Sequence, residues 1–197
     1  MVNSIQVQDR VEVIDDFLPD DVFYPFAFSL MSSGMYKPID YTAEIEEQDG
    51  SIQSFGEMLN PDSNLAEVQF QSLLFRHTED VVQCNDYWLL NPEPFKTLSE
   101  HLNVKRWWQL RVNVTTGQKE PHTGSFHSDF PFNDPKFKTC ILYLNSNNGG
   151  TKFRATGKTV QSIRNRLVKF RTSEFHAGVW ATDVKLRYVL NMTYEEK

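Results

Sequence analysis

The chain has 197 residues, 40% hydrophobic and 13% aromatic, which suits one buried core and is too apolar for a disordered chain. No apolar run approaches the roughly 18 residues that span a bilayer, and the first residues lack the basic start and apolar stretch of a signal peptide. Two distant cysteines, Cys84 and Cys140, argue against a disulfide scaffold. We therefore expect a cytoplasmic protein without a membrane partner.

The net charge of -6 is unevenly distributed. Residues 1–100 carry 19 acidic and 4 basic side chains, whereas residues 101–197 carry 7 acidic and 16 basic ones. The stretch 152–171 holds seven basic residues and no acidic one. It could attract an anionic substrate, but docking on the acidic N-terminal half or forming a solvated hairpin face is the favoured interpretation.

The N-terminal half predicts a strand followed by helices. Val7, Val11 and Val13 recur at the even spacing of a half-buried strand. The acidic run around Pro19 then predicts the start of a helix that Gly34 ends. Its apolar residues follow one helical stripe: Val22, Phe23, Phe26, Ala27 and Leu30.

Further along, residues 44–64 are polar and rich in turn residues, so they predict a loop. A second helix is predicted over about 64–83. A third is predicted over 92–103, where Pro92 and Pro94 suit the first turn.

From residue 107 onward, the pattern changes to short β-type runs separated by turn residues. These runs cover 107–114, 125–130, 139–145, 167–170, 178–181 and 186–194. Helices first and many strands later predict a mainly β fold, a double-stranded β-helix (jelly roll) supported by N-terminal helices. We expect a single domain over 1–197, with 1–106 as a helical and irregular support region and 107–197 as the jelly-roll core.

The candidate chemistry lies in His127-Ser128-Asp129. Side chains alternate along a strand, so His127 and Asp129 are expected on the same face. His176 follows 49 residues later as a third candidate ligand. Two histidines and one carboxylate form the facial triad typical of non-haem iron(II) oxygenases, whereas structural zinc sites usually have four protein ligands, often with cysteine.

Three stretches of the sequence carry a likeness to a known family, and they follow one another in a characteristic order. They are His127-Ser128-Asp129, then Thr139–Asn145 with Gly149–Phe153, then His176 with Arg187–Tyr194. This order resembles the 2-oxoglutarate and iron(II)-dependent oxygenases, particularly their prolyl-hydroxylase-like branch. The opening Val13–Pro19 also resembles that family's N-terminal stretch. The detailed likeness covers residues 107–197, and 36–106 match nothing in it.

The resemblance implies roles for three more residues. Arg187 would pair with the distal carboxylate of 2-oxoglutarate, since a guanidinium group fits a carboxylate with two hydrogen bonds. Tyr143 would donate its hydroxyl to the same carboxylate. Asn113, with Arg111 on the same face of its strand, is the candidate for the proximal end of the cosubstrate. The segment after Asn148 is shorter than the family's usual Gly-Gly-x-Thr-x-Phe form, so that loop is expected to differ in shape.

Three other residues have open interpretations. His122 lies five residues before His127 and is read as a loop histidine rather than as part of the mouth of the site. Phe132 and Trp180 could shape a substrate pocket, but packing in the core explains each equally well.

The resemblance further implies a dioxygenase that uses Fe(II), 2-oxoglutarate and O2, with ascorbate as an optional reductant. It would hydroxylate an unidentified substrate, a peptidyl-prolyl or other peptidyl residue being the nearest analogy, and would release succinate and CO2. The carboxylate of Asp129 favours hydroxylation, because a halide can bind the iron where a small residue replaces that carboxylate.

Other readings stay open. The chain could be a non-catalytic metal-binding jelly roll with a structural or sensory role, an inactive interaction domain, or an oxygenase acting on nucleic acid or a small molecule. Nucleic acid is disfavoured, because the chain is acidic overall and has no aromatic-plus-basic stretch suited to stacking a flipped base.

Overall fold

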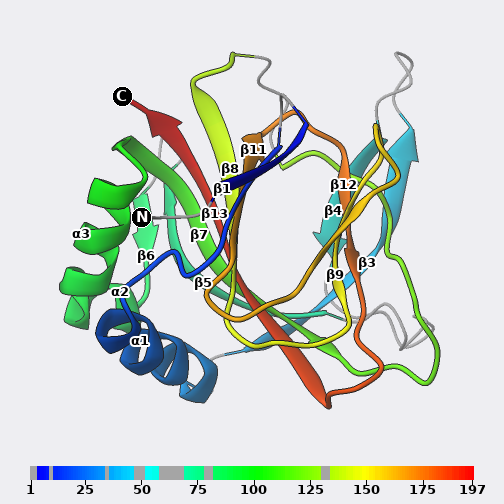
Figure 1. Ribbon diagram of the computed structural model, residues 1–197, viewed down its shortest axis with the longest axis horizontal. Coiled ribbons are helices and arrows are strands. Elements are labelled where there is room, and N and C mark those ends of the chain that lie inside the picture. The colour runs from blue at the N-terminus through cyan, green and yellow to red at the C-terminus, as the bar shows by residue number, and fades with distance from the viewer. Residues whose placement is uncertain are drawn as a thin grey trace.

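The computed structural model of the chain describes residues 4–8, 11–33, 36–46, 52–57, 69–77, 82–129 and 134–197 (Figure 1). The helices are α1 (Asp20–Ser32), α2 (Asp86–Leu90) and α3 (Pro92–His101). The strands of the first half are β1 (Ser4–Gln8), β2 (Val11–Ile14), β3 (Lys37–Glu46), β4 (Ile52–Glu57), β5 (Gln69–His77) and β6 (Val82–Cys84). Those of the second half are β7 (Val104–Thr116), β8 (Phe137–Tyr143), β9 (Gly150–Phe153), β10 (Thr159–Gln161), β11 (Leu167–Arg171), β12 (His176–Val179) and β13 (Leu186–Glu196).

These strands form two antiparallel sheets. The larger has the order β1-β2-β11-β8-β13-β7-β5-β3-β4, with β6 paired to β5, and the smaller has the order β10-β9-β12. The helices lie against one face of the larger sheet, and the smaller sheet lies across from its other face (Figure 1). The predicted mainly β jelly roll with flanking helices is therefore confirmed.

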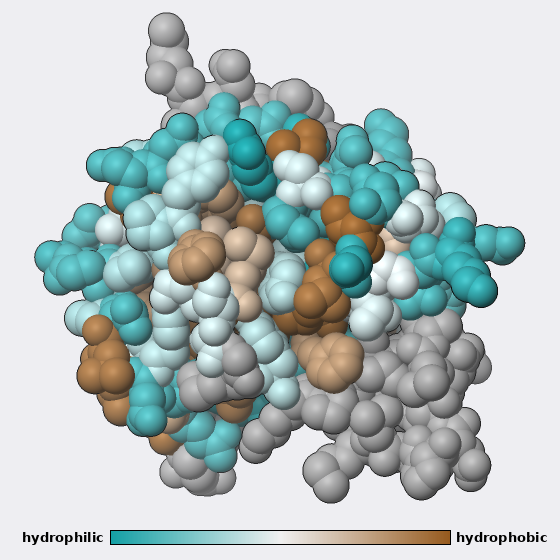
Figure 2. Space-filling model, turned by 90° about the horizontal axis from the view of Figure 1, so that it is seen from below, coloured by the Kyte–Doolittle hydropathy of each residue, from teal (hydrophilic) through white to brown (hydrophobic). Residues whose placement is uncertain are grey.

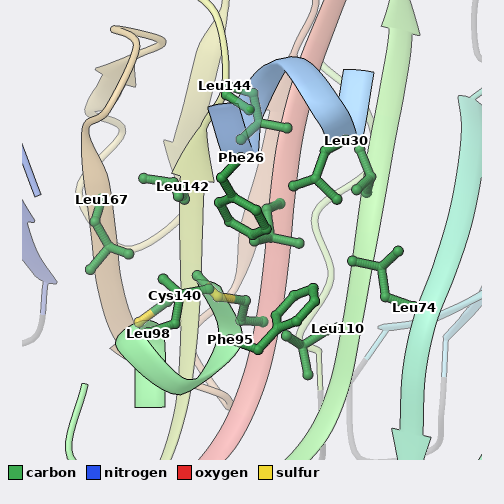
Figure 3. Packing of buried hydrophobic residues seen from close by; sticks show 14 of the residues in the cluster. Phe26, Leu30, Leu74, Phe95, Leu98, Leu110, Cys140, Leu142, Leu144 and Leu167 are labelled. Carbon is green, nitrogen blue, oxygen red and sulfur yellow. The ribbon is translucent and has the colours of Figure 1, made fainter. Parts of the chain in front are cut away.

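The face of the larger sheet that meets the helices is apolar. Alternate residues of β7, such as Leu110 and Val112, point to this side and pair across β13 with Met192 and Leu190. Side chains from α1 and α3, including Phe26 and Phe95, pack on them (Figure 3). Each fully buried side chain of this size contributes about 1.5–3 kcal/mol, so this layer supplies much of the stability of the fold.

The opposite face of the larger sheet is divided in two. Around β2, β8 and β11 it is apolar, and its residues form a second cluster with Phe153 and Val160 of the smaller sheet. Across β13, β7 and β5 it is polar. There, Arg187 pairs in register with Thr115, and Thr115 with Gln69. This polar half faces the candidate site.

Two of the three predicted helices are confirmed, as α1 and α3. The predicted helix over 64–83 is wrong, because residues 69–77 form strand β5. A bulge between Leu73 and Phe75 interrupts the pairing of β5 with β7 within three consecutive apolar residues, so this stretch lacks the alternation typical of a half-buried strand. Helix α2 had not been predicted, and the Asn85 side chain caps it by accepting a hydrogen bond from the backbone N–H of Trp88 at 3.0 Å.

Residues 1–106 are not the helical and irregular support that was predicted, since they supply β1–β6 as well as the helices. The predicted loop 44–64 is wrong for residues 44–46 and 52–57, which lie in β3 and β4, and the rest of it lies outside the described residues. The expected strand through Val7 and Val13 is two strands, β1 and β2, paired antiparallel.

The basic segment 152–171 makes ion pairs with acidic residues near both ends of the chain. Arg166 donates two hydrogen bonds to Asp15, of 2.5 and 2.9 Å, and Lys169 pairs with Glu196. The hydrogen bonds from Arg166, although opposed by burial, hold the pKa of Asp15 below its ordinary value. Docking on an acidic partner within the chain is therefore borne out for Arg166. Among the described residues, no helix combines the length and the apolar character needed to cross a membrane.

Candidate metal centre

His127, Asp129 and His176 converge in space, as predicted. One potential ligand atom from each lies within 4.8 Å of the others. The predicted strand 125–130 is absent from the part that the structure describes. Instead, His127 forms an isolated bridge with His176, and each backbone N–H donates to the other's carbonyl at 2.9 Å. This bridge ties the segment before Asp129 to β12 and brings the two imidazoles together, with ring centroids 4.6 Å apart.

The orientation of both histidines suits metal binding. Nδ1 of His127 lies 3.2 Å from the carbonyl oxygen of Ser125, and Nδ1 of His176 lies 3.0 Å from that of Glu174. A proton on Nδ1 donated to these carbonyls leaves the Nε2 lone pairs for a metal. Nε2 of His176 faces Asp129 Oδ2 at 3.6 Å.

The charge state of the triad also suits a divalent cation. Burial, together with the neighbouring His176, lowers the pKa of His127 to about 4, so its imidazole is neutral at pH 7. Burial acts to raise the pKa of Asp129, but the electrostatic effects of His176 and Arg111 outweigh it and hold that pKa below its ordinary value. A neutral imidazole and an ionised carboxylate are the forms that coordinate metal.

Arg187 lies in the same cavity as His127 and His176. It is only 4% exposed, its Nη2 donates to the carbonyl oxygen of Gly150 at 2.9 Å, and its Nε has no hydrogen-bond partner among the described residues. Burial lowers the pKa of Arg187 from its ordinary value, yet a guanidinium group stays charged. A buried cation with an unused N–H donor is what an anionic ligand would require.

Tyr143 is fully buried beside Arg187, whose Cζ lies 5.6 Å from the centre of its ring. Its hydroxyl lies 2.8 Å from Thr151 Oγ1 and 3.1 Å from the carbonyl oxygen of Val160. In this structure the hydroxyl therefore bonds to the smaller sheet, and its predicted contact with 2-oxoglutarate stays a prediction.

Asn113 faces the cavity, and its Oδ1 accepts a hydrogen bond of 3.0 Å from Gln71 Nε2. Sequence reasoning missed two neighbours in the lining, Gln69 and Thr115, whose Nε2 and Oγ1 have no hydrogen-bond partner in the described part of the chain. Alternation from Asn113 could have found Thr115. Gln69 was missed because the wrongly predicted helix over 64–83 includes it, whereas it lies in strand β5.

Trp180 also lines the cavity, and Gly124 lies so close that an added Cβ would meet the indole ring at 2.6 Å. His122 contacts the edge of the same indole, with ring centroids 5.1 Å apart. Trp180 therefore forms part of the cavity wall. His122 contacts Trp180 but does not line the cavity. Phe132 lies outside the described residues. The face of the molecule seen in Figure 2 carries hydrophilic residues and residues of intermediate hydropathy, with scattered hydrophobic ones among them.

These residues fit a metal ion together with an anionic ligand. Two imidazoles and one carboxylate suit iron(II), and the cavity gives access to one side of the triad. Asp129 Oδ2 is buried and has no hydrogen-bond partner among the described residues, so it is free to coordinate.

No protein-family model and no curated protein matches the chain. Solved structures do. A prolyl-4-hydroxylase from Pseudomonas putida matches with a TM-score of 0.54 and 15% identity, covering 95% of this chain and 92% of that one. A prolyl hydroxylase from Trichoplax adhaerens, solved with a peptide of hypoxia inducible factor, matches with a TM-score of 0.57 and 16% identity, covering 96% and 84%.

The non-heme alpha-ketoglutarate-dependent epimerase SnoN of nogalamycin biosynthesis matches with a TM-score of 0.55 and 12% identity, covering 95% of this chain and 78% of that one. At these identities the matches establish the fold. The chain therefore has the jelly-roll fold of the prolyl-4-hydroxylases and other 2-oxoglutarate and iron(II)-dependent oxygenases.

Proposed function

We propose that this chain is a 2-oxoglutarate-dependent non-haem iron(II) dioxygenase that hydroxylates its substrate. The observation that carries the proposal is one cavity lined by both histidines of the His-Asp-His triad and by a buried arginine with an unused donor. A metal-binding module without this chemistry would have no use for Arg187, because burying a cation without a carboxylate partner is costly. The whole of 1–197 is proposed as one catalytic domain.

In this proposal, His127, Asp129 and His176 hold iron(II), and Arg187 binds the distal carboxylate of 2-oxoglutarate. Tyr143 and Asn113 complete the cosubstrate pocket. Iron(II) with 2-oxoglutarate and O2 supplies the oxidising power to hydroxylate a C–H bond, with succinate and CO2 as co-products.

The chain's own contribution is to orient the reactants and to exclude water. The bridge between His127 and His176 fixes the two imidazoles, and Trp180 closes one wall of the cavity. Holding reactants in this way replaces a costly encounter in solution by a fixed geometry.

We propose a peptidyl residue, with proline first, as the substrate. Support comes from the fold shared with two prolyl hydroxylases, one of them solved with a peptide fragment. The chain shares its fold with SnoN to a similar extent, and this supports a small-molecule substrate equally well. The substrate search therefore includes peptides and small molecules.

The test is an anaerobic titration of the purified protein with iron(II) and then with 2-oxoglutarate. We expect a saturable visible charge-transfer band from the chelated cosubstrate. His127→Ala should abolish it, while Arg164→Ala, a change at an exposed arginine away from the cavity, should leave it intact. Bound iron without a band would favour a metal-binding module, and folded protein that binds no iron would refute the proposal.

A further inference from the structure

The two oxygens of the Asp129 carboxylate have different surroundings. Oδ1 accepts a hydrogen bond of 3.0 Å from Nη2 of Arg111, a residue of β7. Oδ2 has no hydrogen-bond partner among the described residues and lies 3.6 Å from Nε2 of His176. The ion pair is well buried, since the side chains of Arg111 and Asp129 are 14% and 1% exposed. One oxygen is therefore engaged away from the histidines while the other faces them.

Arg111 is the more firmly held partner of this pair. It lies within β7, where it pairs in register with Asn191 of β13 and with Leu73 of β5. Asp129 belongs to no strand, and the nearest backbone pairing is the isolated bridge at His127. The hydrogen bond from Arg111 therefore holds Oδ1 of Asp129 from the sheet.

We propose that Arg111 is a positioning residue, which retains Oδ1 of Asp129 so that only Oδ2 coordinates the metal. This inference rests on the proposed function and deepens it. A carboxylate that binds through one oxygen uses one coordination position, so a triad of single-atom ligands leaves three positions of an octahedral ion for the cosubstrate and oxygen. A carboxylate free to bind through both oxygens would take one of those positions.

A purely structural role for Arg111 predicts something different. In that case its loss would lower the stability of the folded state, as expected for a buried ion pair, but the bound metal would keep its coordination. Positioning predicts that the coordination itself changes. The discriminating measurement is therefore the ligand field of a bound metal, and cobalt(II) reports it through its visible d–d absorption.

The experiment titrates cobalt(II) into the wild-type protein and into Arg111→Met, Arg111→Lys and Arg187→Met, first without and then with 2-oxoglutarate. Arg111→Met should shift the cobalt(II) spectrum before any 2-oxoglutarate is added, and should weaken 2-oxoglutarate binding by roughly 10- to 100-fold. Arg111→Lys, which keeps a cationic donor, should restore most of the wild-type spectrum. Arg187→Met is the matched control, because it should weaken 2-oxoglutarate binding without changing the spectrum beforehand.

A wild-type spectrum and wild-type 2-oxoglutarate affinity in Arg111→Met would overturn the inference and leave the proposed function standing. Wild-type protein that binds no cobalt(II) would overturn both. If Arg111→Met does not fold, as judged by circular dichroism, Arg111→Ala replaces it, since a shorter side chain admits water beside Asp129. The same spectral shift is expected there, and its absence would again overturn the inference.

Discussion

Replacing Arg187 by methionine should weaken ligand binding strongly without lowering the stability of the ligand-free protein. A guanidinium group that clamps a carboxylate makes two charge-assisted hydrogen bonds, each worth about 1.5–3 kcal/mol. Their loss removes about 3–6 kcal/mol of binding free energy, so the affinity for 2-oxoglutarate should fall by roughly 10²- to 10⁴-fold.

The stability of the ligand-free protein should change much less. Arg187 is buried, burial lowers its pKa, and its Nε has no hydrogen-bond partner among the described residues. Methionine avoids the cost of desolvating this charge, and it loses the hydrogen bond to Gly150, worth about 1 kcal/mol, and the contact with Tyr143. We therefore expect a free energy of unfolding that is unchanged or raised by about 1 kcal/mol.

Calorimetry of 2-oxoglutarate binding to manganese(II)-loaded protein measures the first effect, and urea unfolding of the metal-free protein measures the second. Arg187→Lys should give an intermediate affinity, because lysine keeps the charge without the planar pair of donors. Unchanged affinity in Arg187→Met would refute the clamp. A large decrease in the free energy of unfolding of metal-free Arg187→Met would show that Arg187 stabilises the fold instead.

Three further changes test the surroundings of the site. Tyr143→Phe removes a hydroxyl held at 2.8 Å from Thr151, so thermal unfolding should show a loss of about 1 kcal/mol, and calorimetry should show weaker 2-oxoglutarate binding if the predicted contact exists. Gly150→Ala would place a Cβ 2.3 Å from the carbonyl oxygen of Val160 and should cost about 1–3 kcal/mol by urea unfolding, with a wild-type midpoint contradicting the close approach. Asp15→Asn should cost up to about 1 kcal/mol at pH 7 through its pair with Arg166. Since the pKa of Asp15 is lowered below 3.8, this stabilisation is present above that pH and is lost as the pH falls further, so the gap between variant and wild type should close in acid unfolding curves.

The sequence was informative wherever the signal was local. A proline-opened helix at α3 and the long apolar strand β13 follow from neighbouring residues, and the structure has both. The sequence also predicted that His127 and Asp129 lie together, since they are two residues apart, and the structure brings His176 to them. The geometry of the triad, however, rests on a backbone bridge to His176 and not on the predicted strand.

The sequence was misleading where the site itself shapes the pattern. In strand β5, Gln69 lines the cavity at a position where a core strand would carry an apolar residue. The bulge between Leu73 and Phe75 also lies within a run of apolar residues, so the alternation of a strand is lost there. The ion pair of Arg111 with Asp129 could not be found either. Periodicity places Arg111 on the correct face of its strand but does not say which loop lies across from it.

A sheet with two unlike faces explains why such a site can be tolerated. The polar half of the inner face holds buried atoms without hydrogen-bond partners in the described residues, including Gln69 Nε2, Thr115 Oγ1 and Asn191 Oδ1. Each such atom costs about 1–3 kcal/mol, a penalty that a ligand bound in the cavity would relieve. The helix-covered face of the same strands carries the compensating apolar contacts, so stability and binding chemistry are assigned to opposite sides of β7 and β13. Substitutions on the helix side should therefore act on folding, and substitutions on the cavity side should act first on ligands.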